Sequence, residues 1–526
     1  MKKIFLILTT ISLIAGVGCK KSYLDINTNP NQSTSADPSL VLPAALAVTV
    51  ANYYPGPTAF SEWMQSWAVS GSYAINGQDP GTTYKMTTGY GDGIWTSIYD
   101  NLEDYQYIQT SANANGNGFL EGVARIMKAF NYMHLVDLWG DVPYSDALRG
   151  SASLRPKYDA GVDIYDSLFN ELQTSVTLIN NSGATLSANS DIMFGGDKTS
   201  WKQFANTIQL EMILRMSQMA SKPSYFQTAL TSVQTAADVD GFLTSDALVQ
   251  PGYTNSSGQA NPFWQRFYNL SGGLVSSFGD FWAANIYAVN FMKGTNDPRL
   301  PQEYSPVASG PNAGLEIGNT LGLANNNPTN GNYSIFGPGV LKSPGAPAVI
   351  MLAAESYFLQ AEAAALGYLS GSAQTFYEQG VTSSFEYLGA QQHIKSIIDP
   401  TQDSLILSPD ESAANYYSQA NNTKTNFATA TTAAAQQSLI LRQKWVALIS
   451  INSYESYDDY RKFDNLHTGT PPFAGPLGDT PMSASPYIDV AKIPIRILYP
   501  ISEYSKNPDN VPALFNQQTS QIFWMQ

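Results

Sequence analysis

Few side chains in this sequence are suited to covalent or acid–base catalysis. Cys19 is the only cysteine, and the three histidines, His134, His393 and His467, stand far apart, without the H-E-x-x-H spacing of a zinc protease. No G-x-S-x-G motif places a serine on a nucleophile turn. The remaining option is a pair of carboxyl groups about 5 to 9.5 Å apart, as glycosidases use, and 42 acidic residues could contain one. The sequence therefore predicts a protein that is not an enzyme, with a helical glycoside hydrolase as the alternative.

The first residues have the layout of a lipoprotein signal. The segment MKKIFLILTTISLIAGVGC begins with two lysines, continues with apolar or small residues and ends at Cys19. Its apolar run is shorter than the roughly 20 residues that cross a bilayer, and small residues precede the cysteine. We expect residues 1–18 to be removed as a signal peptide and Cys19 to be acylated. The mature protein would then be exported and held at a membrane by lipid.

The charge of the chain excludes several classes of partner. Loss of Lys2 and Lys3 with the signal changes the net charge from −15 to −17. Nucleic acids and anionic lipid surfaces are bound by clustered lysine and arginine, so neither is an expected partner. With one cysteine no intramolecular disulfide can form, and stability must come from packing.

Aromatic residues are frequent in this chain, with 31 tyrosines, 23 phenylalanines and 9 tryptophans, while only 13% of residues are charged. Rings on a neutral, amide-rich background suit an uncharged polyhydroxylated ligand, because sugars lay their C–H faces on aromatic planes. Rings in loops are the better candidates, since rings on helical stripes are needed in the core. The predicted ligand-binding residues are Trp67, Tyr73, Asn76, Gln78, Asp79, Tyr84, Trp264, Phe267, Tyr268 and Trp282. We expect at least two of the six loop rings among them to form a platform.

Apolar residues recur at helical spacing in many segments. The predicted helices are 38–53, 60–67, 94–108, 119–133, 164–179, 201–219, 285–292, 350–364, 376–388, 440–448 and 454–463, with a short strand at 493–498. Asp37 and Pro38 form a helix start, Gly140 a stop, and Glu211 and Arg215 are spaced for an ion pair. His134 lies beside an apolar stripe and is predicted to be a satisfied interior or boundary residue. Four helix–turn–helix units result, without a strict 34-residue repeat.

The sequence predicts a mainly α fold, a scaffold of helix pairs carrying long irregular loops. We expect a signal peptide over 1–18 and one domain over 19–526. Within that domain the helical scaffold covers roughly 38–247 and 347–463, around a loop-rich insertion at 248–346, and an irregular segment follows at 464–526. So long an irregular region inside a packed protein is usually functional.

Five segments behind the lipoprotein signal carry a family pattern. They are Tyr23–Asn31, the stretch DIMFGGDKTSWKQFANTIQLEMILRMS, the helix pair AESYFLQAEAAALGYLSGSAQTFYEQGV, the group Glu455, Tyr457, Asp459, Arg461 and Lys462, and the group Arg496, Tyr499, Pro500, Glu503 and Asn507. In this order, and over nearly the whole mature chain, they resemble the SusD/RagB family of outer-membrane nutrient-binding lipoproteins. Tyr457 stands where the family usually has tryptophan and Lys462 where it has a second arginine, which indicates a divergent branch.

The resemblance implies a tetratricopeptide-like scaffold with ligand bound by loops on one side. It also implies an outer-membrane lipoprotein facing the cell exterior, which captures an oligosaccharide and passes it to a SusC-like TonB-dependent transporter. Peptide capture is the alternative within the family. Segments 455–462 and 496–503 are framework in the family, so their charges are predicted to form buried or semi-buried ion pairs. No cofactor is predicted, although the turns Asn27–Asn31 and Asn296–Asp297 could hold a structural calcium ion without EF-hand spacing.

Overall fold

The computed structural model describes residues 36–70, 77, 79–275, 281–308, 310, 312–323, 333–395, 401–462, 483–488, 490 and 492–526. The predicted signal peptide and Cys19 therefore lie outside the described residues. Within the described ranges, no helix combines the length and the apolar character needed to cross a membrane.

The first half of the scaffold is a succession of helices in which each packs against the next. These helices are α2 (Pro38–Tyr53), α5 (Asp92–Ala114), α6 (Gly118–Trp139), α7 (Gly161–Asn181), α8 (Lys198–Arg215) and α9 (Phe226–Val239). Polar side chains cap the starts of α2, α6 and α8, and in α2 the Asp37 side chain accepts a hydrogen bond from the backbone N–H of Ser39. Gly140, at a φ of 81°, ends α6 as predicted.

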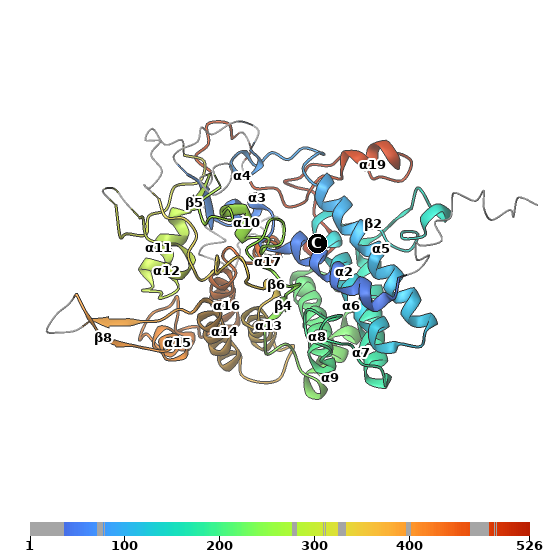
Figure 1. Ribbon diagram of the computed structural model, residues 1–526, viewed down its shortest axis with the longest axis horizontal. Helices are drawn as coiled ribbons and strands as arrows, with labels where there is room; N and C mark the ends of the chain where they lie inside the picture. The colour runs from blue at the N-terminus through green and yellow to red at the C-terminus, as the bar shows by residue number, and fades with distance from the viewer. Residues whose placement is uncertain are drawn as a thin grey trace, which may run out of the picture.

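The second half is also built from packed helices. Its helices are α13 (Ala353–Ala365), α14 (Ala373–Leu388), α15 (Pro409–Tyr417), α16 (Ala433–Ala447) and α17 (Ser453–Lys462). Here α16 returns to pack on α13 and α14 rather than on α15. Helix α13 packs against α14, α16 and α8, so it joins the two halves. In Figure 1 the scaffold helices α7, α8, α13, α14 and α16 lie in the lower part of the view, and α4, β5 and α19 lie above them.

The loop-bearing part is built from short elements. These are α3 (Thr58–Trp63), β1 (Trp67–Val69), α4 (Pro80–Thr83), β2 (Val142–Pro143), β3 (Tyr158–Asp159), β4 (Ala247–Val249), α10 (Trp264–Phe267), β5 (Trp282–Ala284), α11 (Ile286–Gly294), α12 (Leu300–Glu303), β6 (Ala348–Met351), β7 (His393–Lys395), β8 (Asp403–Ile406) and α19 (Ile501–Lys506). Four antiparallel two-stranded sheets pair β1 with β5, β2 with β3, β4 with β6, and β7 with β8. The mainly helical fold is confirmed, and the described part of 248–346 contains no helix longer than the nine residues of α11.

Three local predictions were wrong. The predicted helix 60–67 ends at Trp63 and is followed by strand β1, and the predicted helix 350–364 begins as strand β6. The predicted strand 493–498 does not form. Its backbone bonds instead to two separate segments, from the N–H of Ile495 to the carbonyl of Gln517 and from the N–H of Ile497 to that of Leu138. Helices α9 and α15 were not predicted.

Candidate ligand-binding site

An aromatic cluster joins the loop region to the scaffold. Strand β1 pairs with β5 so that Val69 faces Trp282, and this brings Trp67 and Trp282 to 5.8 Å between ring centroids. Phe336 packs on Trp67 at 4.5 Å and on Phe267 at 5.0 Å. The indole N–H of Trp67 donates to Ser450 Oγ at 2.9 Å. The cluster fixes the position of the loops relative to the helices.

Four predicted ligand-binding rings are therefore core residues. Trp67 and Phe267 have no exposed surface, Tyr84 is 1% exposed and Trp282 is 6% exposed. The two-stranded sheet turns the tryptophans inward, and Phe267 lies on the inner side of α10. These side chains have no surface to offer a ligand, and the structure removes them from the candidate site.

Tyr84 and Asp79 hold the loop after β1 in place. Tyr84 ends α4 in the left-handed conformation, its hydroxyl accepts a hydrogen bond from the backbone N–H of Ser483, and burial raises the pKa of this phenol to about 12. The Asp79 carboxylate caps α4, accepting from the N–H of Gly81 at 3.2 Å and from Thr82 Oγ1 at 2.8 Å. Both side chains are engaged within the protein. The neighbouring predictions Tyr73, Asn76 and Gln78 lie outside the described residues.

Trp264 and Tyr268 form a stacked pair at the surface, named here the 264/268 ring pair. Asn261 Oδ1 accepts hydrogen bonds from the backbone N–H groups of Phe263 and Trp264, which starts the single turn of α10. The turn places residues four apart on one side, and the two ring centroids lie 4.4 Å apart with planes inclined by 25°. Both rings are half-buried. Of the six predicted loop rings, this pair alone comes together at the surface of the described structure.

The 264/268 ring pair lines a pocket of about 250 Å³. Polar residues share the lining, among them Asn255, Gln265 and Asn269. Neither the indole N–H of Trp264 nor the hydroxyl of Tyr268 has a hydrogen-bond partner in the described part of the chain. Asn269 Oδ1 accepts from two backbone N–H groups, which leaves its amide N–H₂ available. Ring surface beside free donors is the chemistry by which proteins hold uncharged sugars.

The comparisons with known proteins agree with this fold. The family model SusD-like_2, described as starch-binding and associating with the outer membrane, matches residues 30–500. This chain belongs to the SusD-like family. No curated protein matches its sequence significantly.

Structures of other proteins in this family superpose over most of the chain. A chitin-binding protein is 25% identical with a TM-score of 0.68, over 90% of this chain and 95% of its own. A chitin-binding SusD homologue from Flavobacterium johnsoniae is 20% identical with a TM-score of 0.68, over 92% and 98%. A SusD homologue from Bacteroides fragilis is 19% identical with a TM-score of 0.69, over 93% and 99%. The tetratricopeptide-like SusD scaffold predicted from the sequence is confirmed.

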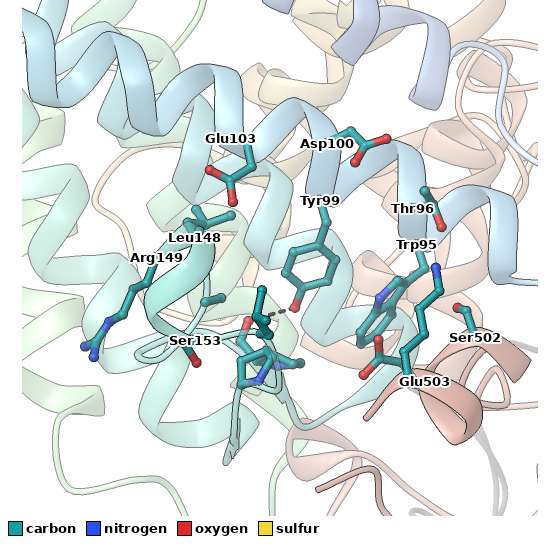
Figure 2. Close-up of a pocket in the computed structure, with 16 residues that line it drawn as sticks. Trp95, Thr96, Tyr99, Asp100, Glu103, Leu148, Arg149, Ser153, Ser502 and Glu503 are labelled. Carbon is teal, nitrogen blue, oxygen red and sulfur yellow. Dashed lines mark hydrogen bonds between the residues drawn. The ribbon is translucent and has the colours of Figure 1, made fainter. Parts of the chain in front are cut away.

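A second pocket of this SusD-like protein, of about 320 Å³, lies between α5, the loop after β2 and α19. Figure 2 shows Asp100 and Glu103 on α5 above Tyr99, and Glu503 on α19. The rings here are already engaged: Trp95 packs against Trp139 at 5.1 Å, and the Tyr99 hydroxyl donates to the carbonyl of Pro143 at 2.7 Å. This charged pocket offers a neutral sugar less free ring surface than the 264/268 ring pair does.

The family segment 455–462 lies inside the protein, as predicted. It contributes to a set of connected buried charges, named here the buried charge network. Its members are the carboxyl groups of Asp137, Glu211, Glu355, Glu362, Glu455, Asp458 and Asp459 and the cations Arg215, Lys444, Arg461 and Lys462. Lys462 pairs with Glu362 at 2.9 Å, and Tyr457 donates to the carbonyl of Pro494 at 2.6 Å. Tyr457 and Lys462, the two residues that depart from the family pattern, are therefore buried and have hydrogen-bond or ion-pair partners in the core.

The prediction for segment 496–503 was wrong in its detail. Arg496 donates to the carbonyl of Trp139 at 2.8 Å and to the Tyr499 hydroxyl at 2.8 Å, while Glu503 accepts from Tyr158 at 2.8 Å. Arg496 and Glu503 form hydrogen bonds rather than an ion pair with each other. The segment still serves as framework.

His134 is interior, as predicted, but it is not satisfied. Its ring packs against Tyr53 at 4.3 Å and Phe130 at 4.6 Å, and neither nitrogen has a hydrogen-bond partner among the residues that the structure describes. Burial lowers the pKa of this imidazole to about 4, so the ring is neutral.

Two groups of oxygens in the described structure were compared with a metal site. Glu211, Glu355 and Glu455 present oxygens within 4.8 Å of one another, and two of these carboxylates are ion-paired, Glu211 with Arg215 and Glu455 with Arg215 and Lys444. In the Asn296–Asp297 turn, the Asp297 carboxylate pairs with Arg299 at 2.7 Å. The other turn suggested for calcium, Asn27–Asn31, lies outside the described residues.

Proposed function

We propose that this SusD-like protein captures an uncharged oligosaccharide at the 264/268 ring pair and delivers it to a SusC-like TonB-dependent transporter. The observation that carries the proposal is the half-buried stack of Trp264 on Tyr268 in an amide-lined pocket, where the indole N–H and the phenol O–H have no partner among the described residues. Two structurally similar proteins are described as chitin-binding, which favours a glycan of N-acetylated sugars. The protein itself performs no chemistry on the ligand.

Trp264→Ala is expected to weaken glycan binding about tenfold to a hundredfold, because it removes a ring contact together with the apolar area it buries. The folded state should persist, since Trp264 is half-buried and adjoins the core without filling it. The measurement is calorimetric titration with chitooligosaccharides and, in parallel, maltooligosaccharides, alongside thermal unfolding.

Tyr107→Ala is the matched control, because Tyr107 is a partly exposed ring on the scaffold helix α5. It should bind glycan like the wild type. Unchanged affinity in Trp264→Ala, or collapse of its fold, would remove the 264/268 ring pair from the site. Affinity for neutral peptides in place of any glycan would identify a peptide-capturing member, and release of reducing ends would identify a hydrolase.

Cys19→Ala tests the anchoring that delivery requires. A lipid chain holds the protein near its transporter and raises its local concentration there. The variant is expected to leave the outer-membrane fraction and to slow glycan uptake by cells, while the purified protein binds glycan with unchanged affinity. Retention of Cys19→Ala in the outer membrane would contradict lipid anchoring at this residue.

A further inference from the structure

A groove of about 630 Å³ lies between α7, α8 and α9, on the scaffold and away from α10. In Figure 1 these three helices occupy the lower edge of the molecule. The volume is within the usual range for small-molecule sites, about 300 to 1,000 Å³. We name this feature the scaffold groove.

The lining of the scaffold groove is almost entirely neutral and polar. The described lining residues include five amides, five hydroxyl-bearing residues and three small apolar ones, without an aromatic ring or a cation among them. Asp240 is the one charged member, and it is ion-paired to Lys202 at 2.5 Å. A charged ligand would find no counter-charge here, and no ring is available for stacking.

One polar group at the base of the groove is unsatisfied. Gln209 on α8 lines the groove and is 2% exposed, and its Oε1 is buried without a hydrogen-bond partner. Its Nε2 faces the carbonyl of Ala205 at 3.5 Å. A buried polar atom without a partner is uncommon in native structures and calls for an explanation, such as a bound ligand or water.

The walls of the groove are rich in hydrogen-bond acceptors. Thr231 Oγ1 donates to the carbonyl of Gln227 and Thr235 Oγ1 to that of Thr231, both at 2.9 Å. On the opposite wall, Thr177 Oγ1 donates to the carbonyl of Gln173 at 3.0 Å. Each of these hydroxyl protons is already used, and the oxygen lone pairs remain. A ligand that fits must therefore donate several hydrogen bonds and carry no charge.

We propose that the scaffold groove is a second binding site, for a neutral polyhydroxylated ligand of about mono- to disaccharide size. Sugar hydroxyls both donate and accept, so they can bond to the threonine oxygens and to the side-chain amides of Gln173 and Gln227, which have no hydrogen-bond partner among the described residues. Rotation of the Gln209 side chain would turn its buried Oε1 toward the ligand. Binding here rests on hydrogen bonds alone, in contrast to the 264/268 ring pair. The proposal is independent of the function assigned to that pair.

The test uses the full chain with Trp264→Ala, which weakens the ring-pair site about tenfold to a hundredfold. Chitobiose, maltose and N-acetylglucosamine are titrated by calorimetry and by ligand-observed NMR. Saturable binding is expected to remain, and Gln209→Leu should weaken it at least tenfold. Thr231→Val, which keeps the shape and removes the hydroxyl, should weaken it severalfold.

Stability measurements separate binding from folding. Gln209→Leu replaces an unsatisfied buried amide by an apolar group, so its thermal midpoint should be equal to or above that of the wild type. Thr174→Val is the matched control, because Thr174 is exposed on α7 outside the groove. It should bind sugar normally. If Gln209→Leu fails to fold, Thr231→Val still decides the outcome.

The experiments can contradict the scaffold-groove proposal and the ring-pair proposal separately. If no sugar saturates Trp264→Ala, or if neither Gln209→Leu nor Thr231→Val changes affinity, the scaffold groove is not a sugar site. A neutral extended peptide that binds the groove in place of all three sugars would also overturn the proposal. If Trp264→Ala leaves binding intact while Gln209→Leu abolishes it, the groove stands and the ring-pair function falls.

Discussion

Arg215→Met is expected to lower the free energy of unfolding by about 3–5 kcal/mol, because it leaves buried carboxylates without their counter-charge. The Arg215 side chain is 1% exposed and pairs with Glu211 at 2.8 Å, with Asp458 at 3.0 Å and with Glu455. Its guanidinium is held charged, since these carboxylates raise its pKa above the ordinary value despite burial. Denaturation by guanidinium chloride, followed by circular dichroism, measures the loss.

Arg125→Met is the control for removing an arginine ion pair as such. Arg125 pairs with Glu121 at 2.9 Å and Glu171 at 2.5 Å, but its side chain is 20% exposed. Solvent can replace that interaction, so the expected loss is at most about 1 kcal/mol. If Arg215→Met is too unstable to purify, Arg215→Lys should fold with an intermediate loss, because it keeps the charge and loses the forked geometry. Equal midpoints for Arg215→Met and the wild type would contradict the account.

Most of the long helices were predictable from this sequence because large apolar residues repeat along them at helical spacing. Phe119, Val123 and Ile126 repeat at helical spacing in α6 and are buried. Helix α9 was not predicted, although Phe226, Leu230 and Val233 repeat at helical spacing on its buried face. Its other positions are mostly Ala, Thr, Ser and Gln, so three large apolar residues are the whole local signal. The helix packs on α8, and that contact completes the burial of its apolar face.

The ligand-binding rings were harder to predict than the scaffold. Phe267 and Tyr268 are neighbours in sequence, yet Phe267 has no exposed surface and Tyr268 stacks on Trp264 at the surface. The difference follows from one turn of α10, which directs adjacent side chains to different sides. Trp67 was assigned to the end of a helix and Trp282 to a loop, and the pairing of β1 with β5, more than two hundred residues apart, buries both. Such long-range pairing leaves no local signal.

The ion pair of Glu211 with Arg215 was predictable because both lie on one helix four residues apart. The remaining members of the buried charge network come from α6, α13, α16 and α17, and only the fold brings them together. Among the residues that the structure describes, the network holds seven carboxyl groups and four cations. Three carboxyl groups must therefore carry a proton for it to be neutral. A sequence motif of charged residues does not reveal this excess.

Glu355→Gln is expected to make stability less dependent on pH, because Glu355 is one of the carboxyl groups that the network keeps protonated. Burial, together with the nearby charge of Glu455, raises the pKa of Glu355 to about 8. Burial likewise raises the pKa of Asp137 to about 7 and that of Glu211 well above its ordinary value. The unfolded chain loses these protons near the ordinary carboxyl pKa, about 4.

Between the ordinary carboxyl pKa of about 4 and the raised pKa of Glu355, about 8, the folded state binds more protons than the unfolded state. The free energy of unfolding of the wild type should then fall as the pH rises, by up to about 1.4 kcal/mol per unit for each such group. His134 acts in the opposite direction, since its pKa is lowered from 6.5 to about 4, so its contribution is complete above pH 6.5. Between pH 6.5 and 8 the contribution of His134 is therefore constant, and the pH dependence of stability reports the buried carboxyl groups.

In that window Glu355→Gln should gain about 1–2 kcal/mol of stability relative to the wild type, because glutamine remains neutral at every pH. Urea denaturation at about pH 6.5, 7.25 and 8 measures the free energy of unfolding of both proteins across this window. Glu386→Gln, at an exposed position on α14, is the matched control and should run parallel to the wild type. Parallel curves for Glu355→Gln as well would mean that Glu355 is ionised in the folded state.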